Sequence, residues 1–190
     1  MIANNCVTIL SGDTGCGKST QVPQFILDDE VIGPGCDIVV TQPRRIRSTS
    51  IVERVAAERR EGNGNSKSSV SAIGYKGRME VNTSPSTQVL FLTLGVLLRK
   101  LQSLPSVLEY THVIIDEIHE RDKYTEFLMI ALRQIMTRDA SSKLHLVLMS
   151  VLHIMGVVSD EHFAGAGGSG GGLGRFGRVT IIVFMYVRFG

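Results

Sequence analysis

Short apolar runs of five or six residues recur along the chain, and longer stretches with polar positions at helical spacing separate them. A run without polar interruption is typical of a parallel strand that is buried on both faces between two layers of helices. The runs that predict strands are 6–10, 37–41, 70–75, 88–92, 112–116 and 144–149, and the stretches that predict helices are 18–29, 47–60, 95–101 and 125–138. The alternation predicts an α/β fold, with a mostly parallel sheet and helices on both of its faces.

The first apolar run leads into a phosphate-binding loop. Residues 12–19 read Gly-Asp-Thr-Gly-Cys-Gly-Lys-Ser, which is the G-x-x-x-x-G-K-[ST] pattern between a predicted strand and a predicted helix. Lys18 is expected to reach the terminal phosphates of a nucleotide and Ser19 to bind Mg²⁺. A glycine-rich turn that binds nothing is the alternative, and the flanking elements argue against it. We assign to ATP binding the loop and the residue after it: Gly12, Asp13, Thr14, Gly15, Cys16, Gly17, Lys18, Ser19 and Thr20.

An acidic pair follows the apolar run that starts at His112. In α/β sheets, ligands bind beyond the carboxyl ends of the strands, which is where the phosphate-binding loop also lies. Asp116 is therefore expected to hold Mg²⁺, and Glu117 to orient and deprotonate the attacking water. A solvated acidic cluster at a helix start is the alternative. The predicted catalytic residues are Lys18, Asp116 and Glu117.

Two further segments lie between the phosphate-binding loop and the acidic pair, Thr41-Gln-Pro-Arg-Arg45 and Phe91-Leu-Thr-Leu-Gly-Val-Leu-Leu-Arg99. Together with Gly12–Gln21 and Asp116–His119, they resemble motifs Ia, Ib, I and II of the DEAH-box RNA helicases. These belong to superfamily 2, and the subgroup that the chain resembles is the one of RNA helicase A. The resemblance runs over residues 5–150, with the motifs in the family's order. It implies a RecA-like P-loop NTPase domain and ATP-driven RNA unwinding or remodelling.

The resemblance also implies roles for residues outside these two sites. Arg54 is expected to stack on the nucleotide base, which suits a planar guanidinium, and His119 and Ser150 to couple the nucleotide site to a partner domain. Single-stranded RNA is the expected partner, through sequence-independent backbone contacts that weaken with salt. The residues that inherit RNA contact by position are Arg44, Arg45, Thr93 and Arg99. For Arg59 and Arg60, a solvated helix face is the simpler interpretation.

The chain departs from the resemblance after residue 150. The related helicases carry Ser-Ala-Thr as motif III, whereas this chain has Ser150-Val151-Leu152 and so lacks the hydroxyl of the third residue. Residues 165–177 include eight glycines, typical of a flexible linker. The apolar run that follows is expected to be a poorly placed tail, with an extra strand on the sheet edge as the alternative. The predicted organisation is a RecA-like ATP-binding domain over 1–150, a remnant of the family's next helix over 151–163, a linker over 164–178 and an apolar tail over 179–190.

Composition adds limits to this interpretation. The net charge of +2 is small, so a surface that binds nucleic acid must be local. Three cysteines without a C-x-x-C pair favour a reduced intracellular location, cytoplasmic or nuclear. The chain shows neither a signal peptide nor an apolar stretch of the ~18 residues that span a membrane, so no membrane partner is expected.

Two other kinds of protein share part of this pattern. A small-molecule kinase would also carry a phosphate-binding loop, but it has no place for motifs Ia and Ib or for the Asp116–His119 segment. A non-catalytic module or decoy that binds nucleotide and RNA stays open, because motif III is altered and no second RecA-like domain is present. Since that second domain supplies arginine fingers, we expect this chain alone to hydrolyse ATP poorly and to unwind nothing.

Overall fold

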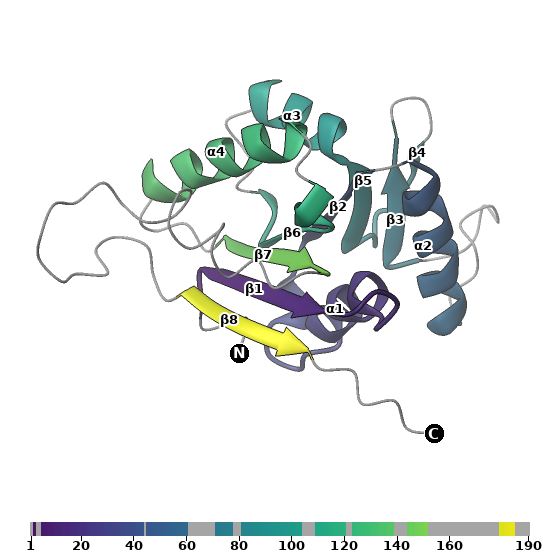
Figure 1. The fold of residues 1–190 in the computed structure, drawn as a ribbon. Coiled ribbons are helices and arrows are strands. Elements are labelled where there is room, and N and C mark those ends of the chain that lie inside the picture. Colours follow the sequence, from purple (N-terminus) through teal and green to yellow (C-terminus); the bar gives the residue numbers. More distant parts are fainter. Residues whose placement is uncertain are drawn as a thin grey trace, which may run out of the picture.

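One eight-stranded sheet organises the computed structural model of the chain, which describes residues 2, 5–43, 45–60, 71–77, 81–103, 109–120, 123–138, 144–151 and 179–184 (Figure 1). The strands are β1 (Val7–Gly12), β2 (Ile38–Gln42), β3 (Ile73–Lys76), β4 (Val81–Asn82), β5 (Val89–Thr93), β6 (His112–Ile115), β7 (His145–Ser150) and β8 (Val179–Phe184). Their order across the sheet is β4-β3-β5-β2-β6-β7-β1-β8. Pairing is parallel throughout this sheet except between β3 and β4.

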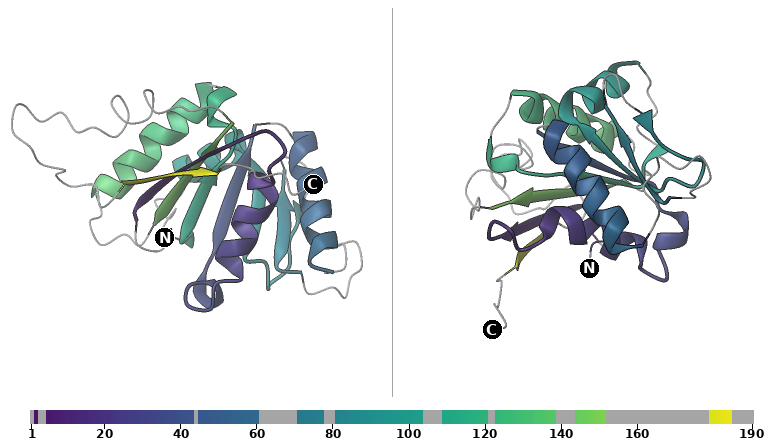
Figure 2. Two further views of the ribbon diagram at one scale, coloured as in Figure 1. Left: turned by 60° about the horizontal axis from the view of Figure 1, so that its bottom comes forward. Right: turned by 90° about the vertical axis from the view of Figure 1, so that its right-hand side faces the viewer.

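Helices cover both faces of the sheet, as the alternating pattern predicted (Figures 1 and 2). The helices are α1 (Lys18–Leu27), α2 (Arg45–Glu58), α3 (Leu94–Ser103) and α4 (Lys123–Arg138), with short 3₁₀ turns η2 (Gly33–Gly35) and η4 (Ile118–Glu120). Buried residues of α3 and α4 pack on one face, and those of α1 and α2 pack on the other. The predicted α/β architecture is confirmed.

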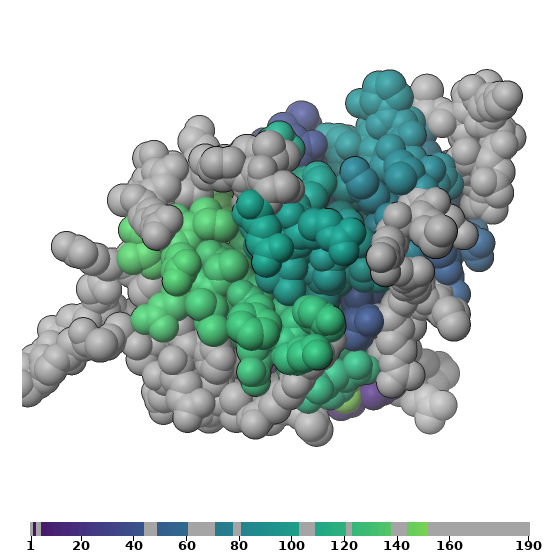
Figure 3. Space-filling view, turned by 90° about the horizontal axis from the view of Figure 1, so that it is seen from above, coloured from purple at the N-terminus to yellow at the C-terminus, as the bar shows by residue number. Residues whose placement is uncertain are grey.

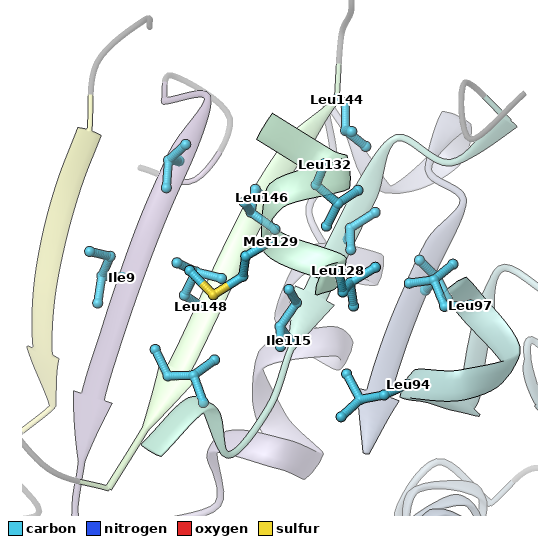
Figure 4. Close-up of a cluster of buried hydrophobic side chains, with 14 of the residues drawn as sticks. Ile9, Leu94, Leu97, Ile115, Leu128, Met129, Leu132, Leu144, Leu146 and Leu148 are labelled. Carbon is cyan, nitrogen blue, oxygen red and sulfur yellow. The ribbon is translucent and has the colours of Figure 1, made fainter. Parts of the chain in front are cut away.

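Strand β6 shows why the apolar runs are unbroken. Val113 and Ile115 belong to the core layer under α3 and α4, whereas Ile114 belongs to the layer under α1 and α2. All three side chains are fully buried, so both faces of the strand pack against apolar layers at these three positions. Figure 4 shows the first layer, in which Leu128 and Leu132 of α4 point towards the sheet.

The C-terminal apolar run differs from the expectation of a poorly placed tail. Residues 179–184 form β8, which lies parallel to β1 from Val7↔Val179 to Gly12↔Phe184 (Figure 1). An apolar, β-rich segment can pair with the N–H and C=O groups that the outer side of β1 would otherwise leave free. The linker predicted over 164–178 and, apart from residue 151, the remnant helix predicted over 151–163 lie outside the described residues.

Two histidines stack at the end of the sheet away from the phosphate-binding loop. The rings of His112 and His145 have centroids 5.0 Å apart and an interplanar angle of 19°. His112 is 3% exposed, and its Nε2 has no hydrogen-bond partner among the residues that the structure describes. Burial, and secondarily the charge of His145, lowers the pKa of His112 to about 4.

Because the pKa of His112 is lowered in the folded chain, we expect the free energy of unfolding to decrease in mild acid. The unfolded chain takes up a proton at His112 near the ordinary pKa of about 6.5, whereas the folded chain resists until about pH 4, so the free energy of unfolding must fall as pH falls between these values. We expect a loss of about 2–3 kcal/mol between about pH 7 and about pH 4.5 in denaturant titrations. His112→Phe keeps an aromatic ring without a titrating group and should flatten this part of the profile. An unchanged pH profile in that variant would contradict the assignment.

Candidate nucleotide and nucleic-acid site

The phosphate-binding loop joins the carboxyl end of β1 to the start of α1. Gly15 and Gly17 have positive φ angles of 79° and 87°, in the left-handed region that side chains disfavour. Gly17 is the residue before α1, and its carbonyl accepts hydrogen bonds from the backbone N–H groups of Thr20 and Gln21. The sequence thus places the N-terminus of α1, with its partial positive charge, behind the loop.

Lys18 lies over the loop that it belongs to. The residue is 8% exposed, and its Nζ donates to the carbonyl oxygens of Gly12 at 2.5 Å and Asp13 at 2.9 Å. The same Nζ lies 3.4 Å from Sγ of Cys16, which is half-buried. The loop's own carbonyl groups therefore hold the ammonium group at the mouth of the loop. A phosphate bound by Lys18 would take over at least one of these donor positions.

Asp116 follows β6 and is held at both of its carboxylate oxygens. Oδ2 accepts a hydrogen bond from Nε2 of Gln42 at 2.5 Å, and Oδ1 accepts one from the backbone N–H of Glu117 at 2.9 Å. Asp116 is only 2% exposed, so these two bonds replace the water that a carboxylate would otherwise bind. β6 and β1 are separated in the sheet by β7 alone, so Asp116 and the phosphate-binding loop lie at the same edge.

Glu117 has a backbone conformation that is uncommon for a residue with a side chain. Its φ is 56°, which only one other non-glycine residue of the described chain, Arg60, approaches with 55°. Such conformations cost free energy and are found preferentially at functional sites. Oε2 of Glu117 lies 3.5 Å from Nδ1 of His119. The turn thereby places the solvent-accessible carboxylate of Glu117 next in sequence to the buried carboxylate of Asp116.

His119 connects the acidic pair to the end of β7. The backbone N–H of Val151 donates to Nδ1 of His119 at 3.4 Å, so the altered motif III still contacts motif II. If Nδ1 carries a proton, it can donate a hydrogen bond to the Glu117 carboxylate. If Nδ1 carries none, it can accept the hydrogen bond from the N–H of Val151. Ser150, the other predicted coupling residue, ends β7 and is 1% exposed.

Arg54 lies on α2 and is tied to the helix of the phosphate-binding loop. Its Nε donates to Oε1 of Glu58 at 3.0 Å, while the side chain stays 71% exposed. The other Glu58 oxygen accepts from Nε2 of Gln21 at 2.9 Å and of Gln24 at 3.0 Å, both on α1. Hydrogen bonds, first from Arg54 and then from Gln24, hold the pKa of Glu58 below its ordinary value. The structure thus places the predicted base-stacking arginine beside the phosphate-binding helix.

The predicted RNA residues divide into two places. Thr93 ends β5 beside Gln42, with which it is in register, at the same sheet edge as Asp116. Arg99 lies further along α3, exposed in a groove of about 510 Å³ between α3 and α4, the face seen in Figure 3. The large apolar side chains of Tyr124, Phe127 and Ile130 also line this groove. Arg44 and the side chain of Arg45 lie outside the described residues.

Arg59 corrects one expectation about the basic surface. Its guanidinium forms an ion pair with Asp28 at 2.8 Å, at the end of α1, and its side chain is only 21% exposed. The solvated helix face predicted for Arg59 is therefore wrong, because Asp28 at the end of α1 lies within reach of α2. Arg60 is exposed, as expected.

Sequence reasoning did not find the roles of Gln42 and Glu58. Gln42 stands inside the Thr41–Arg45 segment, so the motif contained it, but only the sheet order shows that it contacts Asp116. Glu58 gathers donors from two helices, and its spacing of four residues from Arg54 was the one signal available in the sequence.

A parallel sheet with a phosphate-binding loop after its first strand and an oriented acidic pair after β6 defines a RecA-like P-loop NTPase domain. Comparison with known proteins agrees. The crystal structure of the Escherichia coli DEAH/RHA helicase HrpB matches with a TM-score of 0.69 and 29% identity, over 80% of this chain and 18% of that chain. No protein-family model matches the chain.

Curated proteins give the more specific result. DExH-box ATP-dependent RNA helicase DExH1 of Arabidopsis thaliana is 45% identical over 152 residues, which cover 78% of this chain and 14% of that protein. ATP-dependent RNA helicase dhx29 of Xenopus laevis is 46% identical over 148 residues, which cover 76% of this chain and 11% of that protein. The chain belongs with the DExH/DEAH-box ATP-dependent RNA helicases and spans a small part of their length. None of the described helices is long and apolar enough to cross a membrane.

Proposed function

We propose that this chain binds ATP with Mg²⁺ and single-stranded RNA, as the ATP-binding domain of a DEAH-box RNA helicase. The observation that carries the proposal is the arrangement at one sheet edge. A buried Lys18 lies over the phosphate-binding loop after β1, and a doubly hydrogen-bonded Asp116 directly follows β6, two positions away in the sheet. A basic and an acidic group that suit opposite parts of one ligand, a phosphate chain and its cation, thus lie at one edge, and within the described part of the chain Lys18 and Asp116 do not form an ion pair with each other.

Each side chain at this edge fits a role in nucleotide binding. The loop N–H groups and Lys18 face the phosphates. The Ser19 hydroxyl and the Asp116 carboxylate are hard oxygen ligands of the kind that Mg²⁺ prefers, and bound Mg²⁺ would neutralise charge on the terminal phosphates. Glu117 orients the attacking water and accepts its proton. Arg54 stacks on the base, and His119 with Ser150 couples the site to a second RecA-like domain.

The RNA part of the proposal rests on the same sheet edge. Thr93 lies at the carboxyl end of β5, and the chain continues from β2 through Pro43 into Arg44 and Arg45. Loops beyond strand ends are where α/β proteins bind ligands, and arginines there suit the phosphate backbone. Arg99 would contribute from the α3–α4 groove if the RNA extends across α3.

Replacing Arg44 and Arg45 together by Ala is expected to weaken binding to unrelated single-stranded RNAs alike. Each lost phosphate contact should also flatten the salt dependence, by about 0.7 in the log–log slope for a single strand. Fluorescence anisotropy at several ionic strengths, starting at low salt, measures both. Arg60→Ala is the matched control, because Arg60 is exposed, whereas Arg59 is committed to Asp28. Unchanged affinity and slope in the double variant would remove the RNA-contact assignment.

A non-catalytic nucleotide- and RNA-binding module is the second candidate. The altered motif III, Ser150-Val151-Leu152, favours it. A steady-state ATPase assay with and without single-stranded RNA separates the two. RNA-stimulated turnover supports the enzyme, and binding without turnover supports the module.

The free thiols of Cys6, Cys16 and Cys36 support an intracellular setting, cytoplasmic or nuclear.

A further inference from the structure

Gln42 contacts the acidic pair from a neighbouring strand. It is the last residue of β2 and is 1% exposed, and its Nε2 donates to Oδ2 of Asp116 at 2.5 Å. Both side chains are buried, so neither group can exchange this partner for water without a change in the structure. Since the backbone N–H of Glu117 holds Oδ1, the bond from Gln42 fixes the remaining degree of freedom, the rotation of the carboxylate plane.

The sheet order places Gln42 between Thr93, a proposed RNA contact, and Asp116, a proposed Mg²⁺ ligand. On one side β2 pairs with β5, and Gln42 is in register with Thr93. On the other side β2 pairs with β6, and the backbone N–H of Asp116 donates to the carbonyl oxygen of Thr41 at 3.3 Å. Figure 1 shows the three strands side by side. Along the chain, Gln42 is followed at once by Pro43 and the arginine pair.

We propose that Gln42 is a positioning residue that orients Asp116 for Mg²⁺ and transmits RNA binding at the ends of β2 and β5 to that carboxylate. The inference rests on the proposed function of the site. Partners that hydrogen-bond a metal-holding carboxylate orient it and typically change metal affinity 10–100-fold. RNA bound by residues next to Gln42 and Thr93 would set the end of β2, and the amide donor moves with that strand end. Nucleotide and RNA then influence each other's affinity through one buried hydrogen bond.

The first experiment separates orientation of the metal site from the fold. Gln42→Met keeps the length of the side chain without the donor, and Gln42→Asn keeps an amide that is one methylene too short. Affinity for a fluorescent ADP analogue is titrated with excess Mg²⁺ and again in EDTA, in the full chain. Both variants should lose about 10–100-fold in the Mg²⁺ titration and stay within about twofold of the parent in EDTA. Gln88→Met is the matched control, since Gln88 donates to the carbonyl of Gly33 at 3.1 Å and precedes β5 at its other end.

The outcomes are distinct. Parent-like Mg²⁺ affinity in either Gln42 variant would overturn the inference while leaving the nucleotide site intact. Equal losses in Mg²⁺ and in EDTA would make Gln42 a residue of the fold alone and would also overturn it. A parent chain that binds no nucleotide in either condition would refute the proposed function itself, and this inference with it.

The second experiment tests the transmission. The Mg²⁺ titration is repeated with saturating oligouridine at low ionic strength. The parent and Gln88→Met should bind nucleotide at least about fivefold more tightly or more weakly with RNA than without, and Gln42→Met should differ by less than about twofold. RNA affinity measured without nucleotide should be equal in all three proteins. A parent without coupling, or a Gln42→Met protein that retains it, would refute the transmission.

Discussion

Replacing Glu117 by Gln is expected to lower ATP turnover by about 10²–10⁴-fold while nucleotide affinity stays within about twofold of the parent. Gln keeps the size and hydrogen bonding of Glu but cannot accept a proton from the attacking water. The environment favours this division of labour, because Glu117 is on the turn that follows Asp116 and its side chain is 19% exposed, so that water can reach it. Single-turnover hydrolysis with and without RNA, beside a binding titration, gives both numbers.

Asp116→Asn is the matched comparison, because it should affect Mg²⁺-dependent binding, whereas Glu117→Gln should affect turnover. Asp116 is buried and bound at both oxygens, so its neutral amide should weaken the Mg²⁺-dependent part of binding and leave Gln42 facing an altered partner. If the two variants show the same losses in binding and in turnover, the separate roles assigned to Asp116 and Glu117 are wrong.

Lys18→Ala should weaken binding of ATP·Mg²⁺ by about 1.5–3 kcal/mol, or about 10–150-fold, the size of a charge-assisted hydrogen bond. The ammonium is already fixed over the loop by the carbonyls of Gly12 and Asp13, so little order has to be gained when a phosphate arrives. AMP has no terminal phosphates, and its affinity should change much less. Calorimetric titration of ATP and AMP measures the difference.

The control for this variant is another lysine. Lys123 opens α4 and is exposed, with its Nζ 5.3 Å from the ring centroid of Tyr124, and Lys123→Ala should bind ATP like the parent. Equal ATP affinity in Lys18→Ala and the parent would mean that the loop does not bind phosphate in the way proposed.

The sequence was sufficient for the elements that local pattern decides. The run at 112–116 predicted a strand that leads into an acidic pair, and β6 (His112–Ile115) followed by Asp116 is that arrangement within one residue. The phosphate-binding loop was readable because its glycines have to adopt positive φ angles at fixed spacing. Both features need only neighbouring residues, so no knowledge of the sheet order was required.

Contacts between distant segments were not predictable in the same way. The bond from Gln42 to Asp116 joins residues 74 positions apart and exists only because β2 and β6 are neighbours in the sheet. The ion pair of Arg59 with Asp28 depends likewise on how α2 packs beside α1. The pairing of β8 with β1 was open for the same reason, because an apolar run does not specify which edge it joins.

The contact between Val151 and His119 is made by a peptide group and not by a side chain. Every amino acid except proline supplies that N–H, so the exchange of Ala for Val at the second position of motif III leaves the donor in place. The hydrogen bond to His119 therefore does not depend on which side chain residue 151 carries. Most substitutions at residue 151 would therefore keep the hydrogen bond to His119 and, through it, the connection to the acidic pair. Proline, which lacks the amide hydrogen, would remove it.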